Sequence, residues 1–503
     1  MKKLSRYGQL FWLFLTLHTF LWTVTPVFIR HALSDDLIEA FIWGQQFVWG
    51  YDKNPWLPGT LAHIGILLGG RSGIGIYFIQ SLFIALGLFS VWRLMSKISN
   101  PIYALISVMM YEACACYSVD LQIYNDNYIL MGLLPLATLF FYRAIRKEKL
   151  SDWLLAAAIT ALAVMGKYDA ILFAISIFCY LMTTKKRWHY LASYKTWSAL
   201  SIFILLIAPN LLWLSHHHFS TLSYAFHERA DFGNQSWFYQ TKNNLYFVWI
   251  TLLGFLPALV LASLVLTQQR ENLLVEKTNH TYRTHENLNF LFWSGFGPII
   301  LLTLLGFLMG LTLHREWGNA FISLWGAFIL LRLKPSISKD SLKRFIIATF
   351  VMLFVWPTGY LYIASLKDTG VFPAPEIARY ATTVWHKHFH TRLRYVAGDR
   401  YTAGYVALHS HDHPAVWMEW NTQAATWIHE KDLKCHGALF IQDSGHTHQH
   451  FYQGTTFPRK VLNHHPKLKI LRIKEFAWHR NHQKKPNLKL LIGLLPPDAT
   501  QCS

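Results

Sequence analysis

Eleven apolar segments follow one another through most of this chain, and they constrain its fold more than any other feature. A helix that crosses a membrane needs about 20 apolar residues, or fewer where it is broken or buried in protein. We expect spans near residues 8–29, 73–94, 102–119, 127–143, 152–166, 169–184, 197–214, 245–267, 288–312, 318–332 and 344–364. The two short segments at 152–166 and 169–184 could instead form one broken hairpin. The sequence therefore predicts a mainly α, polytopic helical membrane bundle.

The composition agrees with a membrane protein. Charged residues make up 15% of the chain, whereas soluble domains carry about 25%. The net charge is +19, but the basic residues lie between the apolar segments and form no stripe, so we expect no nucleic-acid partner. The five cysteines have no zinc-ligand spacing, and no disulfide framework can be read from them. We expect no cofactor and no resident metal.

The basic residues also predict the orientation. Most loop Lys and Arg residues fall in one set of loops, which begins with the N-terminus. The positive-inside rule places that set in the cytoplasm. The basic, then apolar N-terminus has no small-residue cleavage site, which favours an uncleaved first span. An odd number of spans then places the chain after residue 368 outside, together with the acidic loop at 30–60.

The tail changes character after the last apolar segment. We expect a transmembrane domain at 1–367, with external loops at 30–72 and 215–244, and a small α/β external domain at 368–503. The loop at 215–244 could be a second interfacial helix or a plain loop. The predicted strands are 393–401, 437–443, 468–473 and 488–495, and TAGYVALHS could be a helix. The His-rich segments 409–413 and 446–450 could bind a metal, but we favour solvated loops.

The first external loop carries the densest chemistry. Residues 34–61 read SDDLIEAFIWGQQFVWGYDKNPWLPGTL. Asp36 and Glu39 are three apart, which puts them on one face of a helix. Apolar and Trp residues after them indicate a short helix in the membrane interface, and the Gly and Pro residues of GYDKNPWLP then form a fixed loop. A rigid carboxylate here could act as a general base, although Ser34, Asp35 or Asp36 could also cap the helix.

This loop resembles a known family, the bacterial dolichyl-phosphate-mannose-type glycosyltransferases, which include the aminoarabinose transferase that acts on lipid A. Its members often read D-E-A-E-Q or D-E-A-Y-Y, followed about ten residues later by G-Y-x-x-x-P-P-L. Asp36 matches the catalytic aspartate, Glu39 matches a second acid and Tyr51 matches the Tyr. Two positions depart from the pattern, because Leu37 replaces the usual Glu and Trp56 replaces the second Pro.

The resemblance continues along most of the chain, in order. YNDNYILM places Asp126 where the family has a second external acid. The segment VMGKYDAILF matches a family G-L-A-x-L-x-K-Y segment at Lys167 and Tyr168, and HREWGNAF matches a late external His or Arg at His314 and Arg315. Each motif alone is weak evidence for the family. Their order along the chain and their common side of the membrane are more specific evidence.

The resemblance implies a C-type glycosyltransferase architecture in a bacterial inner membrane. Such an enzyme is inverting and moves a sugar from a polyprenyl-phosphate donor, on the external face, to a hydroxyl acceptor. The acceptor would be lipid A, lipopolysaccharide, another cell-envelope glycan or a protein. The implied partners are therefore this donor, such an acceptor and membrane lipids.

The resemblance also implies roles for single residues. Asp36 would be the base that takes the hydroxyl proton, and Asp126 would orient the acceptor or hold a cation. Glu39 would be a further acid. The implied substrate-binding residues are Tyr51, Lys53, Lys167, Tyr168, His314 and Arg315. Plain structural roles stay open: Lys167 could snorkel to the interface, and Asp126, His314 and Arg315 could cap helices.

Three other functions stay open. A lipid transporter or flippase would place polar residues at the bilayer midplane, often in related halves, whereas these charges gather at one face. A metal-dependent enzyme similar to oligosaccharyltransferases would need several acidic ligands. The candidate ligands are Asp35, Asp36, Glu39 and Asp126. A structural or interaction protein would not need acids and cations gathered on one side.

Overall fold

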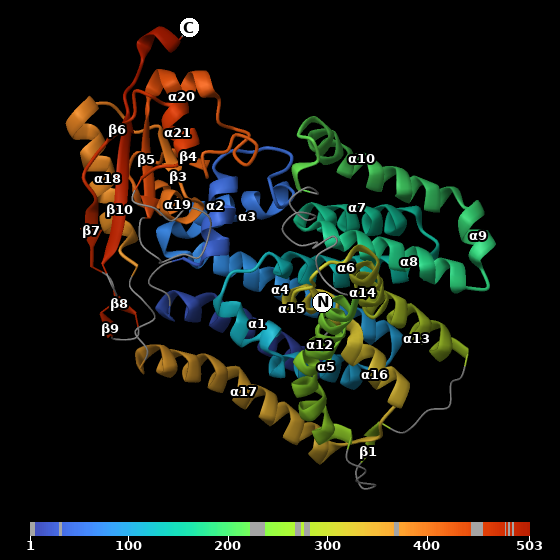
Figure 1. Ribbon diagram of the computed structural model, residues 1–503. Helices are drawn as coiled ribbons and strands as arrows, with labels where there is room; N and C mark the ends of the chain where they lie inside the picture. The colour runs from blue at the N-terminus through green and yellow to red at the C-terminus, as the bar shows by residue number, and fades with distance from the viewer. Residues whose placement is uncertain are drawn as a thin grey trace. The chain divides into compact units, whose positions relative to one another are not determined.

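The computed structural model contains two compact units (Figure 1). Unit 1 comprises Met1–Thr25, Lys53–Leu57 and Tyr77–Tyr360, and unit 2 comprises Pro26–Asp52, Pro58–Ile76 and Leu361–Ser503. The domain boundary expected at residue 367 stays a prediction. The residues described are 6–29, 33–221, 237–266, 273–275, 282–366, 372–443, 456–477, 479–480, 483–484 and 487–502. Residues 222–236 of the loop expected at 215–244, and the segment at 446–450, lie outside them.

Unit 1 is built almost entirely from helices. They are α1 (Arg6–Ile29), α4 (Ile74–Ile98), α5 (Pro101–Met109), α6 (Asn127–Lys147), α7 (Leu150–Gly166), α8 (Ile171–Thr183), α9 (Arg187–Ala192), α10 (Tyr194–His216), α12 (Trp237–Leu266), α13 (Tyr282–Gly295), α14 (Gly297–Met309), α15 (Arg315–Asn319), α16 (Trp325–Leu333) and α17 (Lys339–Leu366). A short antiparallel pair joins β1 (Leu273–Val275) to β2 (Ile337–Ser338). The fold class expected from the apolar segments, a helical membrane bundle, is confirmed.

The helices of the structure differ in length from the spans predicted from the sequence. Within the described residues, six helices are long and apolar enough to cross a membrane, and the bent pair α13 and α14 makes a seventh. The segments predicted at 102–119, 152–166, 169–184 and 318–332 form shorter or broken helices. In the first of these, α5 ends at Met109 and short 3-10 turns follow. Most residues of this stretch are buried, and irregular backbone is tolerated at membrane depth where protein covers it.

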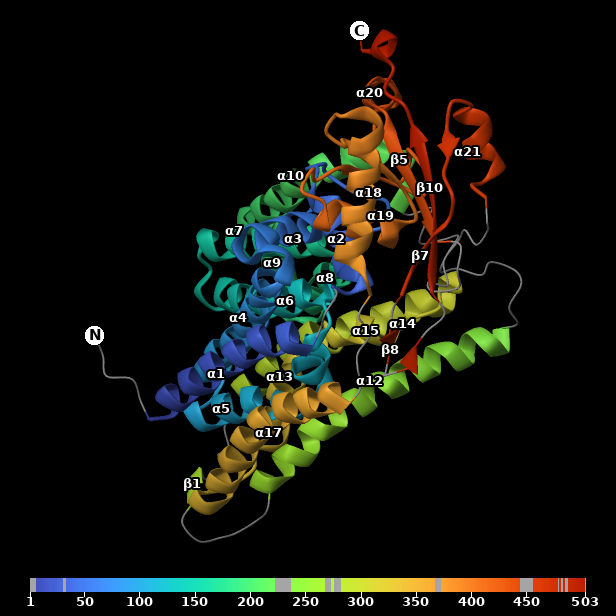
Figure 2. The same cartoon turned by 90° about the vertical axis from the view of Figure 1, so that its left-hand side faces the viewer.

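Unit 2 contains a mixed sheet (Figure 2). The strand order is β4-β3-β5-β10-β6, and β7 also pairs with β10. The strands are β3 (Tyr395–Gly398), β4 (Ala415–Met418), β5 (Ala438–Asp443), β6 (Lys469–Ile470), β7 (Lys474–Phe476) and β10 (Leu488–Leu495); a separate pair joins β8 (His479–Arg480) to β9 (Gln483–Lys484). β3 is parallel to β4 and β5, and β10 is antiparallel to β5. The small C-terminal α/β region expected from the sequence is confirmed, although β4 and β7 were not predicted.

The helices of unit 2 cover both faces of this sheet. They are α2 (Asp35–Gly44), α3 (Trp56–Gly69), α18 (Ala374–Phe389), α19 (Arg400–His409), α20 (Glu430–His436) and α21 (Arg459–His464). In Figure 2, α18 and α19 lie on one side of β10 and α21 lies on the other. The predicted helix in TAGYVALHS is α19, and it forms the crossover between the parallel strands β3 and β4.

Helix α2 is covered by protein on its apolar face. The sequence predicted that this face lies in the membrane interface, but Ile38 and Ile42 are fully buried, and α2 packs against α19. Gly404 permits this approach, because a Cβ atom there would lie 2.4 Å from Ile38 Cγ2 and 2.9 Å from Ile42 Cδ1. Apolar spacing gives an amphipathic helix in both cases, so the sequence alone does not distinguish lipid from a protein partner.

A buried arginine joins the distant segments of unit 2. The Arg400 side chain is 5% exposed and pairs with the carboxylates of Glu39, Asp52 and Glu419. The Nη2–Oδ2 distance to Asp52 is 2.7 Å, and the Nε–Oε1 distance to Glu419 is 3.2 Å. Burial alone would lower the pKa of the Arg400 guanidinium, but Asp52, Glu39 and Glu419 raise it well above its usual value. The cation therefore stays charged inside the protein.

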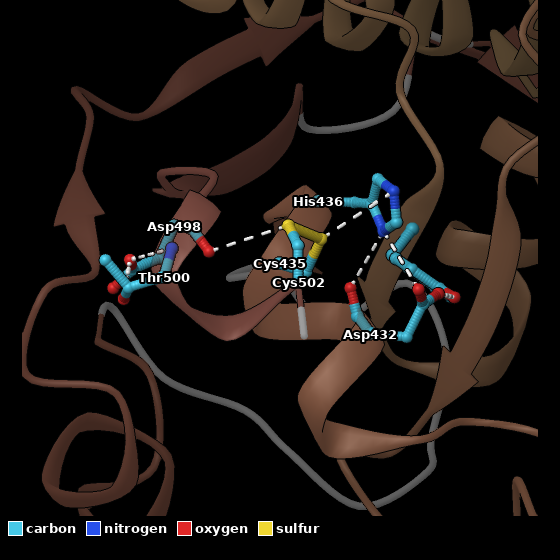
Figure 3. Close-up of a disulfide and its surroundings, with 7 residues drawn as sticks. Asp432, Cys435, His436, Asp498, Thr500 and Cys502 are labelled. Atoms are coloured by element: carbon cyan, nitrogen blue, oxygen red, sulfur yellow. Dashed lines mark hydrogen bonds and ion pairs between the residues drawn. A yellow bond between two sulfur atoms is a disulfide. The ribbon is translucent and has the colours of Figure 1, made fainter.

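A disulfide closes the C-terminal end of unit 2 (Figure 3). Cys435 at the end of α20 is bonded to Cys502, 67 residues later, with the two Cα atoms 4.9 Å apart. His436 lies beside it and its Nδ1 is 3.0 Å from the Asp432 carboxylate. No disulfide framework could be read from the sequence, and this pairing is therefore a correction from the structure. Two half-cystines so far apart in sequence carry no spacing signal.

We predict that Arg400→Met destabilises unit 2. The substitution leaves Glu39 and Asp52 buried without their cation, and breaking a buried ion pair costs about 3–5 kcal/mol. Thermal unfolding of the detergent-solubilised protein measures the loss. Arg379→Met removes an exposed arginine of α18 and serves as the matched control. Equal stability of the two variants would contradict a structural role for Arg400.

We predict that the purified protein has three free thiols before reduction. These are Cys114, Cys116 and Cys179, because Cys435 and Cys502 are joined. Maleimide labelling in denaturant, followed by intact mass measurement, counts the thiols before and after reduction. Reduction should expose all five. A count of five without reduction would show that the disulfide is absent.

Candidate functional site

Unit 1 contains a cluster of one carboxylate, one lysine and two asparagines. The Lys167 Nζ atom lies 2.7 Å from Asn127 Oδ1 and 3.8 Å from Asp126 Oδ1. Asn54 donates its side-chain amide to Asp126 Oδ2 at 2.7 Å. The Lys167 and Asp126 side chains are 17% and 20% exposed. We call these four residues the carboxylate–lysine cluster; its charges are partly shielded from water but still accessible.

Helix ends position the two charges of this cluster. Asp126 stands at the N-cap of α6, and Lys167 stands at the C-cap of α7. The two helices pack closely and run antiparallel across a short turn, so these ends meet (Figure 1). The N-terminal end of a helix favours a carboxylate, and the C-terminal end favours a cation. The helix dipoles therefore stabilise both charges where the chain places them.

Tyr168 and Asp169, which follow Lys167 in the sequence, border the cluster. Asp169 interacts electrostatically with Lys167 and Asp126. The Tyr168 hydroxyl shares hydrogen bonds with the Asn210 side-chain amide, at 3.1 and 3.2 Å, which tie this turn to α10. Sequence reasoning selected Tyr168 but missed Asp169 and Asn210. Asp169 follows directly in the KYD stretch, so its position could have been noticed; Asn210 carries no local signal.

His314 and Arg315 belong to a different element of unit 1. His314 stands at the N-cap of the short helix α15, and its ring lies 5.5 Å from that of Trp317. The Arg315 side chain is 57% exposed and pairs with its neighbour Glu316. Helix α15 packs against α6, the helix that Asp126 begins. These two residues are therefore near α6, but the pairs described for Lys167 and Asp126 do not include them.

The two acids of α2 have different surroundings. Asp36 is exposed in the first turn of the helix, whereas Glu39 is 8% exposed and pairs with Arg400. Ser34 occupies the N-cap position, and its side chain makes no capping hydrogen bond. Asp36 thus remains accessible to solvent, while Glu39 is held inside unit 2.

The loop after α2 is fixed by aromatic packing. Tyr51 is 1% exposed, its ring stacks on Trp43 at 5.4 Å, and its hydroxyl donates to the Gln46 carbonyl. The Trp43 indole donates to Asp52, which also pairs with Arg400. Lys53 follows and is half-buried. The GYDKNP motif thus contributes Asp52 and Asn54 to charged clusters, although sequence reasoning selected only its Tyr and Lys.

One group in unit 2 has side chains that suit a metal. The ligand atoms of His386, His411 and Asp412 lie within 4.8 Å of one another. His386 Nε2 lies 2.9 Å from the buried carboxylate of Asp412, which also accepts from the Leu393 amide. These contacts account for the group as an ion pair that closes a turn, and His411 is largely exposed. The contacts of Asp412 therefore hold part of the segment 409–413, which we expected from the sequence to be a solvated loop.

A protein-family model matches part of this chain. Residues 53–213 match the family model of dolichyl-phosphate-mannose-protein mannosyltransferases. This segment contains Asn54, Asp126, Asn127 and Lys167, which are all four members of the carboxylate–lysine cluster. No protein with a curated description matches the chain in sequence.

Solved structures extend the likeness to the whole chain. ArnT from Cupriavidus metallidurans, bound to undecaprenyl phosphate, aligns with a TM-score of 0.57 at 15% identity, covering 97% of this chain and 98% of ArnT. Its apo state aligns with a TM-score of 0.53 at 13% identity, with the same coverage. At such identity the likeness shows the fold. The resemblance predicted from the sequence is therefore confirmed: this chain is similar to the dolichyl-phosphate-mannose-protein mannosyltransferases and has the fold of the aminoarabinose transferase ArnT.

Proposed function

We propose that this protein is an inverting membrane glycosyltransferase that moves a sugar from a polyprenyl-phosphate donor to a hydroxyl acceptor. The carboxylate–lysine cluster carries the proposal, because all of it lies within the segment that matches the mannosyltransferase family. The fold shared with ArnT supports it, and the ArnT structure contains undecaprenyl phosphate, a ligand of the proposed donor class.

The proposed reaction is a single displacement. The acceptor hydroxyl oxygen forms a bond to the anomeric carbon, the bond from that carbon to the phosphate oxygen breaks, and the hydroxyl proton passes to a carboxylate. Polyprenyl phosphate leaves with an added negative charge. The protein must therefore supply a base for the proton and cations for the departing phosphate.

We assign the base to Asp36. Its carboxylate is exposed in the first turn of α2, so an acceptor can reach it. Glu39 is a weaker candidate, because its carboxylate is already paired with Arg400. We therefore assign Glu39 a positioning role, in which the ion pair fixes the helix that carries Asp36. Asp126 would orient Lys167 within the cluster.

We assign the phosphate contacts to cations of unit 1. Lys167 is the strongest candidate, because Asp126 and Asn127 hold its ammonium group in place, and a lysine can bind phosphate as a point charge. The others are Lys53, His314 and Arg315, with Tyr51 and Tyr168 as supporting residues. Tyr51 would act through the packing of its loop, since it is buried.

We propose that the reaction takes place on the external side of a bacterial inner membrane, with the N-terminus in the cytoplasm. The Cys435–Cys502 disulfide supports an external tail, because disulfides persist in oxidising compartments. The acceptor would be a cell-envelope glycolipid such as lipid A or lipopolysaccharide, another glycan, or a protein.

We predict that Asp36→Asn strongly slows sugar transfer. Loss of a positioned base lowers the rate about 10²–10⁴-fold. The assay uses purified protein in detergent, radiolabelled polyprenyl-phosphate sugars and a membrane glycolipid extract. Glu376→Gln is the control, since Glu376 is also an exposed acid in the first turn of a unit 2 helix.

Three results of this assay would change the proposal. Transfer that survives in a folded Asp36→Asn variant would move the base to another acid. Transfer that a chelator stops and added divalent metal restores would favour the metal-dependent alternative. No transfer with any donor, together with lipid movement in reconstituted vesicles, would favour a transporter.

We predict that Lys167→Met lowers kcat/KM for the donor about 10²–10³-fold, the usual effect of losing one group that stabilises developing charge. Lys167→Arg should retain part of the activity, because it keeps the charge. Lys185→Met removes an exposed lysine from a predicted cytoplasmic turn and should not change the rate. Equal activity of the two methionine variants would exclude Lys167 from donor binding.

A further inference from the structure

Unit 2 contains a cavity that the proposed reaction does not use. It holds about 470 Å³ and lies where β4 ends, between α20 and α21. Its lining includes Trp417, Trp420, Asn421, Gln423, His464 and His465. We call it the tryptophan pocket. Binding sites of small molecules have volumes of about 300–1,000 Å³, and in sheets with parallel strands they lie beyond the carboxyl ends of those strands.

Two ring nitrogens of this pocket are buried without a hydrogen-bond partner among the described residues. They are Trp417 Nε1 and His465 Nε2, and these residues are 5% and 3% exposed. Buried polar atoms in folded proteins nearly always have a partner, so each exception needs a reason. Both residues line the pocket, but these two nitrogens have almost no accessible surface, so the polar contacts to a ligand must come from more exposed lining residues such as Asn421 and Gln423.

The charges around the pocket are largely balanced. Burial, with help from His464 and Lys434, lowers the pKa of His465 to about 4, so the ring is neutral near pH 7. Two carboxylates, Glu419 and Glu430, also line the cavity. Glu419 is paired with Arg400, Glu430 is paired with Lys434, and Lys460 also lines the cavity, so no unbalanced charge marks the pocket for a charged ligand.

An unusual turn presents one tryptophan at this pocket. Glu419 and Trp420 have φ angles of +54° and +52°, and the Asn421 amide donates to the Met418 carbonyl at 2.9 Å. A turn with two left-handed central residues normally contains Asn and Gly. Residues held in this region persist where the surroundings enforce them, often at functional sites. Here the Arg400–Glu419 ion pair anchors the turn.

We propose that the tryptophan pocket binds a saccharide, a hexose ring with free hydroxyls. Aromatic faces accept the apolar C–H side of such a ring, and the side-chain amides of Asn421 and Gln423 match its hydroxyls. The ring could belong to the acceptor glycan or to the donor sugar. The proposal does not rest on Asp36 or Lys167, because it concerns binding alone.

Saturation-transfer NMR on the full-length protein in detergent tests the proposal. The probes are di- to tetrasaccharides of glucose, galactose, mannose and N-acetylglucosamine. At least one should bind, and the exposed-residue variant Gln423→Ala should weaken it about tenfold. Trp420→Ala should abolish binding, whereas Trp420→Phe retains an aromatic face and should bind more weakly. Gln501→Ala, an exposed glutamine of unit 2 outside the pocket, should have no effect.

Several outcomes separate the possibilities. The proposal is overturned if no saccharide binds, or if Gln423→Ala and Trp420→Ala bind like the wild type. Displacement of a bound saccharide by a polyprenyl-phosphate sugar, but not by undecaprenyl phosphate, assigns the pocket to the donor sugar. Absence of displacement assigns it to the acceptor. Saccharide binding that persists in Asp36→Asn separates this proposal from the catalytic one.

Discussion

A single buried cation determines how unit 2 is assembled. Arg400 would be very costly to bury alone, so it must gather carboxylates from other parts of the chain. It takes Glu39, 361 positions earlier in the sequence, together with Asp52 and Glu419. This requirement brings the N-terminal acidic loop against the C-terminal sheet. It also holds α2, the helix that carries Asp36, against α19.

Unit 1 handles its charges differently. Its cluster uses helix ends rather than full burial, with Asp126 at the start of α6 and Lys167 at the end of α7. Because the two helices run antiparallel, their favourable dipole ends meet, and the charges are stabilised while still partly exposed. In the proposed reaction, a cation held in this way would stabilise the departing phosphate without a large rearrangement.

The same arginine links the fold of unit 2 to its pocket. Glu419 accepts from Arg400 and also forms the left-handed turn that presents Trp420. Loss of Arg400 would therefore release the turn as well as α2. In this unit, stability and the proposed recognition of a saccharide depend on one ion network, so a binding defect in an Arg400 variant could not by itself be assigned to the pocket.

The sequence alone determined the helical membrane character, the C-terminal strands and the resemblance that selected Asp36, Asp126 and Lys167. These follow from hydropathy, alternation and motif order, which are local properties of the chain. Only the tertiary structure decided which charges pair, that α2 packs on protein rather than lipid, and that Cys435 joins Cys502. Such choices depend on partners tens to hundreds of residues away, and the energy of a buried charge or a packed face is set by those partners rather than by its own neighbours in sequence.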